Sequence, residues 1–176
     1  MLELMIALLL KVTEDVVIVG PSKRRYEEFG MEIVADLWPG EGPLGGIITA
    51  LEVTAKCPAK CRWNLIVSCD MPFLTEEWLM FLVQRAELSA ADVILARSTS
   101  GPEPLCAVWR TAALSKLRPA FERGARKVMD GVRHLRAEVL DEEDWKRFDK
   151  AGRLFWNMNT RADYVEARRI VEAETR

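Results

Sequence analysis

An apolar run that ends abruptly in a carboxylate and a proline reads Leu65-Ile66-Val67-Ser68-Cys69-Asp70-Met71-Pro72-Phe73. A run of this length with turn signals after it is typical of a strand buried on both faces, as in a parallel sheet. Because ligands bind beyond the carboxyl ends of such strands, Asp70 is predicted to lie where a substrate binds. Its carboxylate suits a hard cation such as Mg²⁺ held against phosphate oxygens. The alternative is an aspartate that only begins a solvated helix.

Strand and helix patterns alternate on both sides of this run. The alternation predicts βαβ units, and therefore an α/β fold with a mostly parallel sheet and helices on both faces. A length of 176 residues favours one domain, residues 1–176. The predicted strands span residues 15–20, 31–37, 63–69, 93–96, 105–109 and 155–159. The predicted helices span 2–11, 22–29, 44–55, 111–122 and 125–135, with one more capped by Thr75 and a last one opened by Thr160 and Asp163.

The charge balance argues against some partners. With 25 basic and 27 acidic residues the chain has no basic excess, so general binding to nucleic acid or to an anionic membrane is not expected. The apolar start, residues 1–10, lacks a positive region, carries Glu3 and is far shorter than the ~20 residues that span a bilayer. We interpret it as a buried helix and expect a cytoplasmic protein.

Cysteine and histidine chemistry has little support. Cys69 and Cys106 fall in strand-like runs and are expected in the core, and the pair Cys57 and Cys61 lacks two further ligands for zinc. His134 is the only histidine and lies in a polar segment, which argues against a Ser-His-Asp hydrolase.

A glycine-rich segment, Gly40-Glu41-Gly42-Pro43-Leu44-Gly45-Gly46, leads directly into a predicted helix. Glycines let a ligand approach the backbone closely, and the first N–H groups of a helix attract anions. A plain tight turn is the alternative. Asp36, just before this segment, is a second carboxylate at the same rim, and its alternative is a turn-forming aspartate.

Two further pairs carry polar groups. Asn157 and Asn159 alternate along a predicted strand, so both side chains are expected on one side, either binding a polar ligand or satisfying loop backbone. Arg126 and Lys127 lie near a predicted helix start, where the helix dipole disfavours cations. This conflict indicates a phosphate partner, with a solvated pair as the alternative.

Taken together and in order, five segments resemble the molybdenum cofactor guanylyltransferases, which belong to the MobA-like nucleotidyltransferases. The resemblance covers essentially the whole chain and implies a three-layer Rossmann-like nucleotidyltransferase fold. It is carried by GPLGGIITALE, VSCDMPFL, EPLCAVW, GARKVM and FWNMNT.

The resemblance also implies an activity and a site. The activity is transfer of GMP from GTP to molybdopterin, with Mg²⁺ as the cofactor and pyrophosphate as the leaving group. One alternative is a related nucleotidyltransferase that uses CTP or a sugar phosphate. Another is an inactive or partner-dependent paralogue that only binds the pterin cofactor. The implied roles are metal binding by Asp70, a nucleotide site at Asp36 and at Gly42, Pro43, Leu44, Gly45 and Gly46, a basic position at Arg126 or Lys127, and pterin-side amides at Asn157 and Asn159.

The chain departs from the family pattern at one place. The family begins with a central strand and a glycine-rich Leu-Ala-Gly-Gly loop, which the sequence lacks. Without that strand, two rows of backbone groups in the sheet would stay unpaired. We expect that the reading frame begins further upstream, that the sheet closes up, or that a strand comes from another chain, as in a homo-oligomer.

Overall fold

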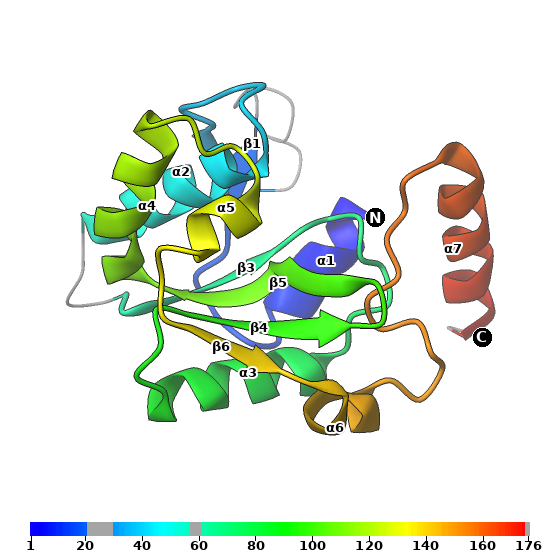
Figure 1. Cartoon of the computed structure of the whole chain (residues 1–176). Coiled ribbons are helices and arrows are strands. Elements are labelled where there is room, and N and C mark those ends of the chain that lie inside the picture. The colour runs from blue at the N-terminus through cyan, green and yellow to red at the C-terminus, as the bar shows by residue number, and fades with distance from the viewer. Residues whose placement is uncertain (21–29, 57–60, 175–176) are drawn as a thin grey trace.

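A computed structural model describes residues 1–20, 30–56 and 61–174. The predicted helix at 22–29 and Cys57 lie outside these residues. Figure 1 shows how helices and strands alternate along the chain. In chain order the elements are α1 (Leu2–Leu9), β1 (Val17–Gly20), β2 (Glu32–Ala35), α2 (Pro43–Ala55), β3 (Trp63–Val67), α3 (Glu76–Leu88), β4 (Val93–Ser98), β5 (Gly101–Arg110), α4 (Leu114–Glu122), α5 (Val128–Val132), β6 (Ala137–Leu140), α6 (Glu142–Trp145) and α7 (Arg161–Glu174), with 3₁₀ turns at Thr111–Ala113 and Lys146–Phe148.

Four strands form the main sheet, in the order β3-β5-β4-β6. β6 is parallel to β4, whereas β5 is antiparallel to both β3 and β4. Three of the four strands therefore run in the same direction, which confirms the predicted α/β fold class with a mostly parallel sheet.

Alternate residues of β4 supply two different cores. Val93 and Leu95 pack with α2, α4 and α5 on one face of the sheet, while Ile94 and Ala96 pack with α3 on the other. This two-residue alternation follows from the pleat of a strand. Figure 1 shows the same arrangement, with α2, α4 and α5 gathered on one side of the sheet and α3 on the other. Helices thus cover both faces, as predicted.

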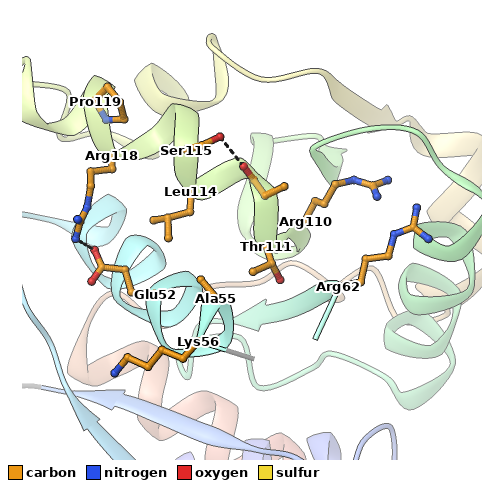
Figure 2. A pocket seen from close by; sticks show the side chains of 11 residues that line it. Glu52, Ala55, Lys56, Arg62, Arg110, Thr111, Leu114, Ser115, Arg118 and Pro119 are labelled. Carbon is orange, nitrogen blue, oxygen red and sulfur yellow. Dashed lines mark hydrogen bonds and ion pairs between the residues drawn. The ribbon is translucent and has the colours of Figure 1, made fainter. Parts of the chain in front are cut away.

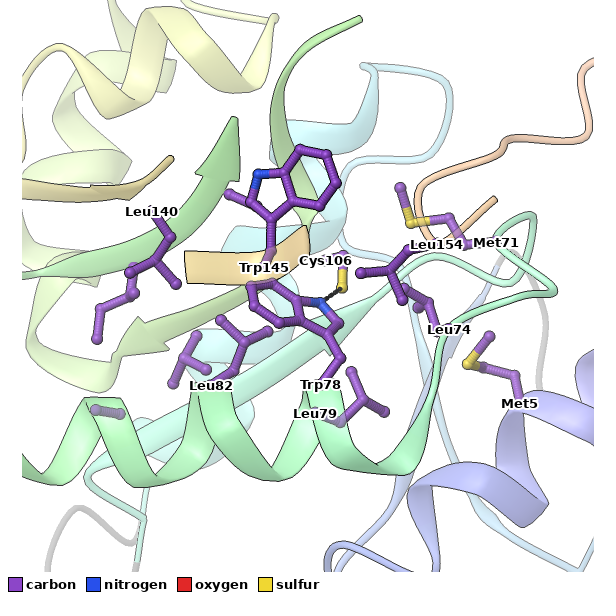
Figure 3. Close-up of a cluster of buried hydrophobic side chains, with 14 of the residues drawn as sticks. Met5, Met71, Leu74, Trp78, Leu79, Leu82, Cys106, Leu140, Trp145 and Leu154 are labelled. Carbon is purple, nitrogen blue, oxygen red and sulfur yellow. Dashed lines mark hydrogen bonds between the residues drawn. The ribbon is translucent and has the colours of Figure 1, made fainter. Parts of the chain in front are cut away.

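The core on the α3 face is built around Trp78, which is fully buried (Figure 3). Its indole N–H donates to the sulfur of Cys106 at 3.3 Å. Burial raises the pKa of the Cys106 thiol to about 12, so this cysteine acts as a small core side chain, as predicted. The same prediction for Cys69 is wrong, because Cys69 is exposed in the loop after β3. Thr75 caps α3 through a hydrogen bond from the Trp78 N–H, as predicted.

Helix α1 joins the main sheet to a separate pair of strands. β1 and β2 pair with each other in parallel and form their own two-stranded sheet. Met5 of α1 packs into the α3-side core, whereas Ile6 packs with Ile18 and Ile33 of β1 and β2. Within the described residues β1 and β3 do not pair, so the sheet has not closed up directly between them.

Some predicted elements differ from the observed ones. Residues 155–159 are not a strand: Met158 donates one backbone hydrogen bond to the Asp70 carbonyl (2.9 Å), and no ladder continues from it. The helix predicted at 125–135 is restricted to Val128–Val132. Strand β6 and helix α6 were not predicted.

Within the three described ranges, no helix combines the length and the apolar character needed to cross a bilayer.

The two adjacent glycines of α2 allow a matched test of packing. A Cβ at Gly45 would lie 2.8 Å from the Cβ of Trp38, whereas one at Gly46 would meet nothing within 4 Å. We expect Gly45→Ala to lower the free energy of unfolding by about 1–3 kcal/mol through overpacking. Gly46→Ala should raise it by about 0.5–1 kcal/mol, because alanine loses less backbone entropy in a helix. Urea denaturation measures both, and equal changes would contradict the predicted close packing of Gly45 on Trp38.

Candidate active site

A cavity of about 550 Å³ lies beyond the carboxyl end of β3. This is the sheet edge at which open α/β folds bind ligands. The cavity brings together most of the polar residues that the sequence singled out, although they come from distant segments. Its lining consists of Gly42, Pro43, Asp70, Met71, Pro102, Glu103, Pro104, Leu105, Arg126, Lys127, Val128, Met129, Asn157 and Asn159.

Asp70 lies three residues after the end of β3, in the loop that leads to α3. Its Oδ1 atom is buried and accepts no hydrogen bond from the described residues. A buried polar oxygen without a partner costs free energy, so most such atoms in proteins are paired. The orphaned oxygen fits a group that the protein itself does not supply, such as a cation.

The segment that carries Asn157 and Asn159 is held against the loop after β3. Trp156 stacks on Phe73 with a ring-centroid distance of 5.3 Å, and the Met158 N–H bonds to the Asp70 carbonyl. Both asparagines line the cavity, as the predicted same-side arrangement requires, even though the segment is irregular.

The helix that follows this segment begins as predicted. The Asp163 carboxylate accepts the N–H groups of Asn159 and Thr160, while Thr160 Oγ1 accepts the Asp163 N–H. Hydrogen bonds from Thr160 lower the pKa of Asp163. This cap fixes the chain immediately after the cavity.

The glycine-rich segment approaches the cavity at its helix start. Gly42 has a φ of 89° and precedes Pro43 at the first turn of α2. A Cβ on Gly42 would lie 3.3 Å from the Arg126 carbonyl, so this position combines a left-handed backbone with a close approach. Gly42 and Pro43 line the cavity.

Arg126 and Lys127 differ in how they are held. The Arg126 guanidinium donates to Glu41 (2.5 Å) and to the Phe121 carbonyl (2.7 Å), and it lies over the Phe121 ring. Lys127 is exposed and forms no ion pair with any described residue. Arg126 therefore ties two loops together at the rim, while Lys127 places there a cation that has no ion-pair partner among the described residues.

Four predicted site residues do not line this cavity. Leu44 and Gly45 are buried in the packing of α2, and Gly46 lies one residue further along the helix. The Asp36 Oδ1 atom accepts the Trp38 N–H and the Thr49 hydroxyl, each at 3.0 Å. Asp36 thus organises the turn into α2, which is the alternative that its sequence context left open.

Glu103 is a cavity residue that the sequence reasoning missed. It is only 6% exposed and lies in an irregular part of β5, because Leu95 of β4 pairs with Ala107 but Arg97 already pairs with Pro102. Bulges of this kind redirect side chains and are frequent next to active sites. The signal in the sequence was the pair of prolines around Glu103, since proline within a strand marks an edge or a bulge. Burial raises the pKa of Glu103, and the nearby charge of Asp70 raises it further.

A larger cavity, of about 800 Å³, lies at the opposite end of the β3–β5 pair. Figure 2 shows its basic rim, in which Arg118 pairs with Glu52. The Arg110 guanidinium donates to the carbonyls of Ser89 and Ala91 at 2.8 Å each. None of the predicted site residues lines this cavity, and its polar groups are largely paired with the protein, so it is not the candidate active site.

The fold and the position of the cavity define the class, a Rossmann-like nucleotidyltransferase. The sequence model of the MobA-like NTP transferase domain matches residues 1–139 of the chain. The chain therefore belongs to this family of nucleotidyltransferases.

Individual relatives agree with this assignment. A probable molybdenum cofactor guanylyltransferase of Pelotomaculum thermopropionicum is 31% identical over 162 residues, covering 92% of this chain and 76% of that protein. One of Chloroflexus aggregans is 31% identical over 166 residues, covering 93% and 76%. Among solved structures, molybdopterin-guanine dinucleotide biosynthesis protein A of Archaeoglobus fulgidus superposes with a TM-score of 0.77 at 26% identity, covering 96% of this chain and 86% of that one.

The raised pKa of Glu103 predicts a pH dependence of stability. The folded chain holds the Glu103 proton more tightly than the unfolded chain, where the pKa is near the ordinary 4.5. The free energy of unfolding should therefore fall as the pH rises from about 4.5 through the folded-state pKa. Glu103→Gln removes this contribution, so the variant should become progressively more stable than the wild type as the pH rises. Urea denaturation in EDTA between about pH 4 and pH 8 measures it, with the exposed Glu77→Gln as control. Parallel profiles for wild type and Glu103→Gln would contradict the prediction.

Proposed function

We propose that this chain transfers GMP from GTP to molybdopterin, releases pyrophosphate and uses Mg²⁺. The observation that carries the proposal is the convergence of Asp70, the Gly42 loop, the cations at 126–127 and the two asparagines on one cavity at the end of the sheet. The names of the relatives, molybdenum cofactor guanylyltransferase and molybdopterin-guanine dinucleotide biosynthesis protein A, support the same substrates.

The chemistry of the donor set fits a magnesium ion. Asp70 offers a buried oxygen without a partner, and the described residues contain no cluster of three or more histidines, cysteines or carboxylates that would form a complete protein cage. Mg²⁺ is usually held by one or two carboxylates together with substrate phosphates and water, so a single aspartate suffices. When bound, the ion neutralises charge on the phosphate oxygens.

The proposed reaction requires no general base from the protein. The attacking group on molybdopterin is a phosphate monoester, whose second pKa of about 6 leaves it mostly dianionic at neutral pH. It can attack the α-phosphorus of GTP without a general base, which agrees with a cavity that has no histidine in its lining. The bond from the α-phosphorus to the new oxygen forms, and the bond to pyrophosphate breaks. Alignment and charge neutralisation are the tasks that remain.

The lining residues divide these tasks by their geometry. Lys127 supplies an unpaired cation for phosphate oxygens, and Arg126 holds its loop against Glu41 so that this cation faces the cavity rim. Asn157 and Asn159 present carboxamides to the polar edge of the acceptor. Gly42 lets the start of α2 lie close to the Arg126 carbonyl, beside Lys127.

Replacing Asp70 tests the role of the orphaned oxygen. We expect Asp70→Asn to reduce Mg²⁺-dependent formation of the dinucleotide by at least about a hundredfold, because a neutral amide holds the cation poorly. Stability should change by less than about 1 kcal/mol, since Asp70 supports no core contact. Incubation with GTP, Mg²⁺ and molybdopterin measures the product, and the binding of Mn²⁺, followed by its electron paramagnetic resonance signal, should weaken in parallel.

The matched control is Asp130→Asn, on α5 but outside the lining, where among the described residues the carboxylate pairs with Arg133. It should leave transfer unchanged. Unaltered transfer by Asp70→Asn would refute the proposed role. A parallel assay with CTP in place of GTP tests the nucleotide, and a chain that binds pterin but neither GTP nor CTP would instead support a paralogue without transfer activity.

Lys127 provides a second test. Because Lys127 has no ion-pair partner among the described residues, Lys127→Ala should leave the free energy of unfolding unchanged. It should lower kcat/KM for GTP by about tenfold or more through the loss of phosphate neutralisation. Arg123→Ala, a nearby exposed cation outside the lining, serves as control. Equal effects of the two substitutions would show that only the general positive field matters.

A further inference from the structure

The proposed transfer chemistry does not use Glu103, although this residue is the most buried carboxylate of the cavity. Its Oε1 atom lies 2.6 Å from the Ser98 hydroxyl. No other hydrogen bond or ion pair reaches the carboxylate from the described residues. One oxygen is thus anchored by the hairpin between β4 and β5, while the second has no partner among the described residues.

The Glu103 side chain is largely buried, and no cation neutralises it among the described residues. Burying a carboxylate is unfavourable without a cation or a full set of donors. Pro102 and Pro104 flank Glu103 and have no N–H groups to offer, and the closest charge influence comes from Asp70, which has the same sign. A group held at such cost in a cavity is a candidate for ligand recognition.

The cavity around Glu103 restricts the class of ligand. Pro104, Leu105 and Met129 give it apolar walls, which suit a flat heteroaromatic ring. A carboxylate at one edge of such a ring accepts two parallel hydrogen bonds best from an amino group beside a ring N–H. That pair of donors is the edge of a 2-amino-4-oxopyrimidine ring, which both pterins and guanine contain.

We infer that Glu103 is the specificity-determining residue that binds the amino and ring N–H edge of a pterin. This inference rests on the proposed function, in which the acceptor is a pterin. The choice of pterin over guanine follows from the neighbours of Glu103. Both residues proposed for the acceptor, Asn157 and Asn159, line its cavity, whereas of the six positions implied for the nucleotide only Gly42 and Pro43 do.

A binding experiment with two probes tests the inference. Pterin and lumazine differ at position 2, where pterin has the amino group and lumazine has an oxygen. The wild-type chain should bind pterin about tenfold or more tightly than lumazine, because the oxygen would face the carboxylate. Glu103→Gln keeps the shape of the side chain but should reduce this ratio to about threefold or less. Fluorescence titration measures all four affinities, and Glu77→Gln should retain the wild-type ratio.

Three results would overturn the inference: equal binding of the two probes by the wild type, no binding of pterin, or an unchanged ratio in Glu103→Gln. If Glu103→Gln instead changes the preference for GTP over XTP, the edge bound is that of guanine. If it weakens Mn²⁺ binding alone, Glu103 is a cation ligand. Both results contradict the pterin assignment.

The titration needs no turnover and can therefore fail independently of the transfer assay. A chain that prefers pterin through Glu103 but forms no dinucleotide refutes the proposed function and leaves this inference standing. A chain that forms the dinucleotide while Glu103→Gln leaves the pterin preference unchanged refutes only the inference.

Discussion

The antiparallel pairing of β3 with β5 determines where the parts of the candidate site meet. Val67 pairs with Cys106, and the Ser68 N–H extends the ladder by bonding to the Leu105 carbonyl at 2.8 Å. Beyond this point the two segments separate. Asp70, after β3, and Glu103, in β5, line the same cavity. Because β5 also pairs with β4, the position of β5 and of its cavity residues is fixed from both sides, whereas Asp70 lies in the loop after β3.

The remaining residues of the cavity are positioned by packing. The first turn of α2 is placed through its buried residues Leu44 and Ile48, and the chain before α7 is placed by the stacking of Trp156 on Phe73. Arg126 connects the rim by reaching Glu41 and the Phe121 ring. Each contact lies outside the chemistry that we propose, yet each decides which polar group reaches the cavity.

The fold was largely predictable because several strands are short apolar runs that are followed by turn-forming residues. The run at 65–73 located both the strand and Asp70, and the Thr75 and Thr160 caps located the next helix and the last one. The predicted strand at 155–159 failed because its aromatic residues pack against other rings, Trp156 on Phe73 and Phe155 on Trp78 and Trp145. A β-like composition does not distinguish such packing from a ladder. Asp36 illustrates the same limit at the site: a carboxylate at a strand end serves equally well as a turn acceptor, and only the positions of Trp38 and Thr49 decide.

The choice between the two cavities rests on how their polar groups are paired and not on their volumes. In the larger one, Arg118 pairs with Glu52 and Arg110 is held by two carbonyls, so these groups stabilise the fold without a ligand. In the smaller one, Asp70 keeps a buried oxygen without a donor, and Glu103 is held by one hydroxyl between two prolines. Folding alone gives no reason to keep acceptors unsatisfied in a buried place, because an apolar side chain of similar size would be more stable there. The unpaired Asp70 oxygen at the carboxyl end of β3 is therefore the observation that favours the smaller cavity as the candidate site.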